Sequence, residues 1–129
     1  MVARTARTLL LVRLLALELY QRMVESLARH KLTPTQYMVL SLASDHSNLS
    51  TADMARRFQI APQSMNQTVA SLLAKRLITR CESPTHRRIL HIGLTPSGSK
   101  LLARCDAAID RLAWSLAMLN TMYCVGVNS

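Results

Sequence analysis

The sequence predicts a single, mainly helical domain with a small antiparallel β hairpin. Half of the 129 residues are hydrophobic, but only 4% are aromatic, and the chain holds three glycines and four prolines. Leucine, alanine and methionine, which favour helices, are abundant, whereas β-branched residues are few before Ile78. The few glycines and prolines leave little room for long loops. A chain of this length forms one domain with its own core.

The first expected helix spans residues 6–29, and its apolar side chains at first cover nearly the whole circumference. A helix that is apolar on all sides must be buried on all sides. A domain this small can cover only part of it, so we expect a second copy of the chain to cover the rest. Arg13 interrupts the apolar run, which stays short of the ~18 residues that a membrane span needs. We therefore expect this segment to belong to the fold and the protein to have no membrane partner.

Capping boxes predict the starts of the next two helices. Thr33 is followed three residues later by Gln36, and Ser50 is followed in the same way by Asp53. In a capping box each of the two side chains binds a backbone amide of the other residue, which satisfies amides that the first helical turn leaves free. The polar run of residues 44–48 predicts the turn between these two helices.

A fourth helix is predicted to begin at Pro62, with Met65, Val69 and Leu72 on one apolar face. Its other face carries amides and hydroxyls, which are crowded at the N-terminal end. A short helix, a turn of about three residues and a second helix with a polar exposed face fit the helix-turn-helix, in which the second helix enters the major groove of DNA.

The periodicity changes after this helix. Residues 77–81 and 89–94 alternate in the manner of strands, and residues 82–88 supply turn residues and a basic tip. A hairpin in this place is the wing of a winged helix. The run from Thr95 to Gly98 then caps a last long helix with an apolar stripe. We expect that helix to join two subunits together with the first.

The positive charge is concentrated in the segment from Met54 to Arg104. This segment holds nine cations and a single carboxylate, Glu82, and so carries eight of the nine net positive charges of the chain. The cations are Arg56, Arg57, Lys75, Arg76, Arg80, Arg87, Arg88, Lys100 and Arg104. A charge excess on a helix–helix–hairpin unit indicates a polyanionic partner, of which duplex DNA is the commonest.

Three strings, LTPTQYMVL, LSTADMARRFQIAPQSMNQTVASLLAKRLITR and SPTHRRILHIGLTPSG, resemble the MarR (multiple antibiotic resistance regulator) family of winged-helix transcription factors. The resemblance covers nearly the whole chain. It implies a winged helix-turn-helix core at residues 33–95 between dimerisation helices at 6–30 and 97–127. It also implies a cytoplasmic, ligand-responsive repressor that binds a pseudo-palindromic operator in double-stranded DNA as a homodimer.

The wing departs from the family pattern at one position. The family usually has an aspartate two residues before the arginine that enters the minor groove, and this chain has His86 there, followed by Arg87 and Arg88. By position, Arg88 corresponds to the minor-groove arginine. In the family the aspartate holds this arginine in place, and Arg88 lacks that carboxylate.

Two sets of residues are candidate DNA contacts. Amide and hydroxyl side chains on the recognition helix can bond base edges, and basic or hydroxyl side chains around it can bond phosphates. The first set is Pro62, Gln63, Ser64, Asn66, Gln67 and Thr68, with Pro62 also fixing the helix start. The second set is Ser50, Thr51, Arg56, Lys75, Arg76, Arg87 and Arg88. Any single member could instead be ordinary solvated surface, and Ser50 and Thr51 also serve as caps.

The resemblance further implies a small aromatic or phenolic effector between the dimerisation helices and the winged helix. The residues that could line its site are Tyr20, Met23, Leu27, Tyr37, Met38 and Leu40. For each of them, ordinary core packing is the alternative.

The sequence contains no catalytic motif, and its four histidines have no metal-like spacing, so we expect neither an enzyme nor a metal or other cofactor. Cys81, Cys105 and Cys124 are widely spaced, which fits a reducing cytosol, and each is expected to be a small buried hydrophobe. Two alternatives remain open. In one, the basic face binds an acidic protein or membrane surface, which anionic liposomes would reveal. In the other, Cys81 or Cys105 is a redox sensor, which mass spectrometry after mild peroxide would reveal.

Overall fold

The computed structural model describes residues 2–83, 85 and 88–127, and the side-chain surroundings within residues 3–115 of these ranges. It contains five helices and a two-stranded antiparallel sheet among those residues, in the order α1, α2, α3, α4, β1, β2, α5. The predicted fold class is confirmed. The wing residues Pro84, His86 and Arg87 lie outside the described residues. The predicted contact Arg87, and His86 at the position of the family's aspartate, therefore have no structural description.

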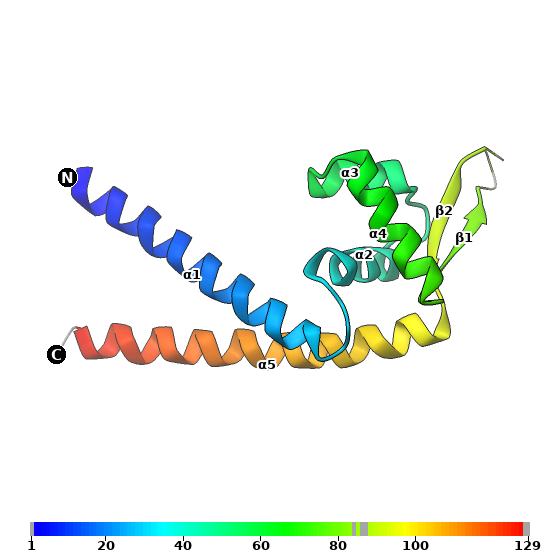
Figure 1. Cartoon of the computed structure of the whole chain (residues 1–129). Helices are drawn as coiled ribbons and strands as arrows, with labels where there is room; N and C mark the ends of the chain where they lie inside the picture. Colours follow the sequence, from blue (N-terminus) through cyan, green and yellow to red (C-terminus); the bar gives the residue numbers. More distant parts are fainter. Residues whose placement is uncertain (1, 84, 86–87, 128–129) are drawn as a thin grey trace.

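Two long helices form the base of the molecule. Helix α1 (Val2–Ala28) begins four residues earlier than predicted, because residues 2–5 contain neither glycine nor proline and continue the helix. Helix α5 (Pro96–Val127) packs against α1. The two helices meet near the C-terminal end of α1 and diverge, so that the N-terminal end of α1 and the C-terminal end of α5 stand apart (Figure 1). No helix among the described residues is long and apolar enough to cross a membrane.

Three shorter helices, α2 (Pro34–Asp45), α3 (Thr51–Phe58) and α4 (Pro62–Ala74), lie on one side of α5 (Figure 1). Both predicted capping boxes are present. The Thr33 hydroxyl accepts from the Gln36 amide at 3.2 Å, and the Gln36 side-chain oxygen accepts from the Thr33 amide at 3.0 Å. Ser50 and Asp53 form the equivalent pair at the start of α3. Local sequence therefore determines where α2 and α3 begin.

The three turns that end α1, α3 and α4 each place a residue other than glycine in the left-handed region. These residues are Lys31, Gln59 and Arg76, with φ angles of 57°, 54° and 58°. In each case the next amide bonds back to a carbonyl five residues earlier, as the Leu77 amide does to the Leu72 carbonyl at 3.1 Å. This hydrogen bond closes the helix end and offsets a strain of about 1 kcal/mol at each left-handed residue.

The wing is built from β1 (Ile78–Glu82) and β2 (Leu90–Leu94), with Arg80 directly opposite Ile92. Both strands begin one residue later than predicted. Backbone bonds in the same register extend past both ends of the hairpin, from the Thr95 amide to the Leu77 carbonyl at 3.1 Å and from the Ser83 amide to the Ile89 carbonyl at 3.0 Å. The Ile92 amide donates to the Leu49 carbonyl at 2.9 Å, and this contact anchors the sheet to the start of α3.

The core lies where α2, α4 and the sheet meet α1 and α5. Its largest fully buried side chains are Leu27, Leu40, Met54, Met65, Leu72, Ile92, Val39, Val69 and Cys105. A buried amide connects two helices within it, since the Gln36 side-chain nitrogen donates to the Ser71 hydroxyl at 3.0 Å. This bond and the burial of Met65, Val69 and Leu72 turn the apolar face of α4 inward. Its amide-rich face therefore points outward.

Candidate nucleic-acid interface

Helix α4 presents the predicted recognition residues to solvent. Met65, Val69 and Leu72 are fully buried beneath it. The exposed members of the predicted set are Pro62, Gln63, Ser64, Asn66 and Gln67. Thr68 is only partly exposed, and its hydroxyl donates to the Ser64 carbonyl of its own helix at 3.1 Å. Thr68 is therefore less free to contact a partner than its neighbours are.

The N-terminus of α4 differs from those of α2 and α3. Its N-cap residue is Ala61, and no side chain accepts a hydrogen bond from the amides of the first turn. Uncapped amides at a helix start, together with the helix dipole, favour an anion at that end. The exposed amide side chains of Gln63, Asn66 and Gln67 thus lie beside a local preference for negative charge.

The structure separates the predicted cations into those already engaged and those that are not. Arg56 forms an ion pair with Asp53, and hydrogen bonds from Ser50, followed by Arg56, hold the pKa of Asp53 below its usual range. The Lys75 ammonium donates to the Lys31 carbonyl at 2.7 Å. Within the described ranges, Arg76 and Arg88 form no ion pair through their guanidinium groups. Contact of Arg56 or Lys75 with a phosphate would compete with these internal partners.

A groove connects the recognition helix to the wing. Its volume is about 380 Å³. It is lined by Ser50, Thr51, Ala52, Asn66, Arg80, Arg88, Ile89 and Leu90. Four of these, Ser50, Thr51, Asn66 and Arg88, belong to the predicted contacts, so the fold brings together residues that are up to 38 positions apart in the chain. The Ser50 hydroxyl is already engaged with Asp53, to which it donates at 2.9 Å.

Arg80 was not among the predicted site residues, although it lines this groove beside Arg88. In the sequence it is an ordinary member of a strand, two residues after the buried Ile78. Its place became visible only from the strand register, which sets it opposite Ile92 at the point where the sheet meets α3 and α4.

The residues predicted to line an effector site are divided between the core and the surface. Leu27 and Leu40 are fully buried in the hydrophobic core, Met23 and Tyr37 pack against it, and Tyr20 is 53% exposed on α1. Met38 is partly buried. The Tyr37 hydroxyl donates to Asp106 of α5 at 2.6 Å. Burial and this bond to a carboxylate raise the pKa of Tyr37 well above its usual value.

The cysteines do not share one environment. Cys105 is buried in the core, as predicted, and burial raises the pKa of its thiol. The prediction was wrong for Cys81, which is exposed on β1 because the outer part of this strand extends beyond the core. The surroundings of the Cys124 side chain lie outside the description. In the part of the chain with described side chains, the redox alternative is thus restricted to Cys81.

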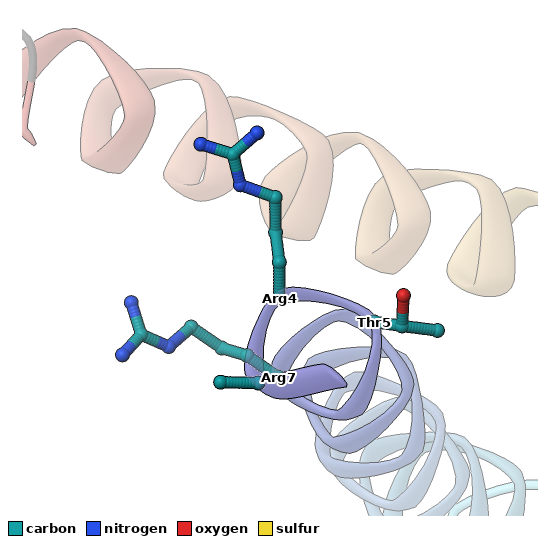
Figure 2. A pocket seen from close by; sticks show the side chains of 4 residues that line it. Arg4, Thr5 and Arg7 are labelled. Carbon is teal, nitrogen blue, oxygen red and sulfur yellow. The ribbon is translucent and has the colours of Figure 1, made fainter. Parts of the chain in front are cut away.

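Another basic site lies at the far end of α1. A cavity of about 730 Å³ is lined there by Ala3, Arg4, Thr5 and Arg7. Figure 2 shows the Arg4 side chain extending toward the ribbon of α5. The described residues that line this cavity all belong to the first turns of α1, and none of them lines the groove beside α4.

The chain is similar in sequence to known proteins. Residues 30–89 match the model of the MarR family. The chain is 30% identical over 76 residues to the HTH-type transcriptional repressor MdtR of Bacillus subtilis, covering 59% of this chain and 49% of the relative. It is 31% identical over 78 residues to the HTH-type transcriptional repressor Mb2911 of Mycobacterium bovis, covering 60% and 56%. The chain thus spans about half the length of these curated relatives.

Solved structures share the fold over almost the whole chain. MepR, a transcription regulator of the Staphylococcus aureus multidrug efflux pump MepA, has a TM-score of 0.78 at 24% identity, over 92% of this chain and 91% of that one. BldR from Sulfolobus solfataricus has a TM-score of 0.77 at 16% identity, over 100% and 99%. A mutant of MepR bound to an oligodeoxyribonucleotide has a TM-score of 0.71 at 24% identity, over 92% and 91%.

Proposed function

We propose that the protein is a sequence-specific, DNA-binding transcriptional regulator that acts in the cytoplasm, and the match of residues 30–89 to the MarR family model supports this. The observation that carries the proposal is the exposed, amide-rich start of α4, which has no side-chain cap and lies beside a groove that contains two arginines. Base edges would bond to the amide side chains, and phosphates to the arginines and the free backbone amides. Repression is the direction that the relatives' names support.

The proposed regulator is a homodimer. A long apolar run on α1 is exposed in the single chain. It comprises Leu9, Leu10, Leu11, Val12, Leu14, Leu15, Leu17, Leu19, Tyr20 and Val24. Monomeric proteins rarely expose apolar patches of this extent, and two-fold symmetry is the commonest way to cover one. A dimer joined through α1 and α5 would hold two copies of α4 at a fixed separation, as a pseudo-palindromic operator requires.

Base reading by α4 is tested with an operator selected from random duplexes by the wild-type protein. Gln63→Ala and Gln67→Ala are each expected to lose preference at particular base pairs, by about 1–3 kcal/mol per pair, because a bidentate amide contact is removed. Fluorescence anisotropy with single-base operator variants measures this preference. Gln21→Ala removes an exposed amide from α1 and should leave the preference unchanged. A dimer that binds no duplex at low salt would contradict the proposal.

The effector would act through the same dimer. We propose that a small aromatic or phenolic molecule binds near Tyr20, Met23 and Tyr37, with Leu27, Met38 and Leu40 behind them. If it binds one separation of the two α4 helices better than another, linkage requires that it change DNA affinity. Titrating simple phenols and benzoates into the protein–operator complex should release DNA, and Tyr37→Phe should shift the concentration required. Equal DNA affinity at every concentration of a compound that binds the protein would argue against this mechanism.

A further inference from the structure

Two neighbouring grooves share a wall made by Ser50, Ala52 and Ile89. The larger, of about 610 Å³, contains Asp53 and Arg56, which are paired with each other. The smaller, described above, contains Arg80 and Arg88. The first groove is therefore internally neutralised by its ion pair, whereas the second carries two positive charges.

The two arginines of the smaller groove have no internal partner among the described residues. Neither guanidinium group forms an ion pair or a hydrogen bond with described residues, and no carboxylate is among the described residues that line the groove. Glu82 lies on the same face of β1 as Arg80, but it pairs across the sheet with Leu90 and forms no ion pair with described residues. Two adjacent unpaired guanidinium groups repel each other and favour an anion between them.

The other polar residues of the lining carry hydrogen-bond donors. Asn66 lines the groove from α4 and Thr51 from the start of α3, and a side-chain amide and a hydroxyl can each donate to a phosphate oxygen. Guanidinium groups match the geometry of phosphate oxygens and bind them through two parallel hydrogen bonds. The exposed side chains of Ile89 and Leu90 complete the lining.

The backbone beneath Arg80 is firmly held. Arg80 pairs with Ile92, whose side chain is fully buried and whose amide donates to the Leu49 carbonyl. Arg80 therefore projects from a point tied to both the sheet and the start of α3. The backbone of Arg80 therefore has a defined position relative to Asn66 of the recognition helix, which lines the same groove.

We propose that this groove binds a phosphate of the DNA backbone and that Arg80, from the wing strand, is one of its two cationic ligands. The inference rests on the proposed function and adds a contact outside both the recognition helix and the wing tip. A phosphate held there would set the register in which Asn66 and its neighbours meet the bases.

The test compares Arg80→Ala with Arg104→Ala, which removes the same charge from an exposed position on α5. DNA affinity is measured by anisotropy over a range of salt concentrations. Each lost phosphate contact lowers the magnitude of the slope of log K against log salt by about 0.9. We expect Arg80→Ala to show this decrease for each bound subunit, and Arg104→Ala to keep the wild-type slope. A circular dichroism spectrum like that of the wild type confirms that both variants are folded.

A second arm locates the phosphate. Operators that carry a neutral methylphosphonate at one backbone position at a time should weaken wild-type binding at the position that meets Arg80, and should not weaken Arg80→Ala further there. Equal salt slopes for Arg80→Ala, Arg104→Ala and the wild type would overturn the assignment. A wild type that binds no DNA would instead remove the proposed function.

A free anion is the other source of the same chemistry. Calorimetric titration with inorganic phosphate distinguishes it. Phosphate binding that is lost in Arg80→Ala, without any effect of that substitution on DNA binding, would identify a free anion as the ligand and overturn the DNA assignment.

Discussion

Replacing Gly98 with alanine is expected to destabilise the protein by about 2–3 kcal/mol, the cost of forcing extra atoms into a packed contact. A Cβ at this position would lie 2.0 Å from the carbonyl oxygen of Leu77 and 3.0 Å from its carbonyl carbon, and both are backbone atoms. The first turn of α5 would have to move. That movement would strain the bonds from Thr95 to the carbonyls of Leu77 and Arg76, which are 3.1 and 2.7 Å long.

The sign of the change in the free energy of unfolding separates the steric contact from helix propensity. Helix propensity alone predicts that alanine stabilises a helical position by about 1 kcal/mol relative to glycine. Urea denaturation at one fixed protein concentration measures the change, because the stability of a dimer depends on concentration. Gly93→Ala is the matched control, since its Cβ would meet only the Thr79 hydroxyl oxygen, at an ordinary 3.5 Å. If Gly98→Ala were as stable as Gly93→Ala, the close approach of α5 to Leu77 would be wrong.

Replacing Leu14 with glutamate is expected to dissociate the proposed dimer and to lower operator affinity by at least about 10²-fold, because a two-site contact becomes a one-site contact. Leu14 lies in the middle of the apolar run of α1 and is 52% exposed in the single chain. In a two-fold dimer the substitution occurs twice. It would bury two unpaired charges, whose desolvation is not offset by any partner.

Analytical ultracentrifugation and anisotropy on the same samples measure the dissociation and the loss of affinity together. Gln21→Glu places a negative charge at an exposed polar position of the same helix and should leave both unchanged. A Leu14→Glu protein that remains dimeric would show that the apolar run of α1 does not form the interface. A monomer that keeps full operator affinity would show that dimerisation does not set the contacts with DNA.

Much of the fold could be predicted because its signals are local. The capping boxes at Thr33 and Ser50 join residues three positions apart, so they can be read from the sequence and are present in the structure. The spacing of Met65, Val69 and Leu72 identified the buried face of α4 for the same reason. The strand starts were each missed by one residue. The bonds from Thr95 to Leu77 and from Ser83 to Ile89 continue the same register, so the difference concerns only the ends of the hairpin. The bond from the Ile92 amide to the Leu49 carbonyl joins separate elements, and it could not be predicted.

The candidate site shows the same limit. The sequence located a basic segment and an amide-rich helix face, since both are properties of residues close together in the chain. It did not distinguish Lys75, whose ammonium bonds to a carbonyl 44 residues away, from Arg80 and Arg88, which have no described partner. Nor did it distinguish the exposed Cys81 from the buried Cys105.

By itself, then, the sequence determined the helices, their inner and outer faces and the region of positive charge. Hydrogen bonds within one helical turn and the period of apolar residues decide these features. Only the tertiary structure decided which cations are neutralised internally and which meet in one groove. Electrostatic interactions act through space between elements that are distant in the chain, and the packing of α3, α4 and the wing sets those distances.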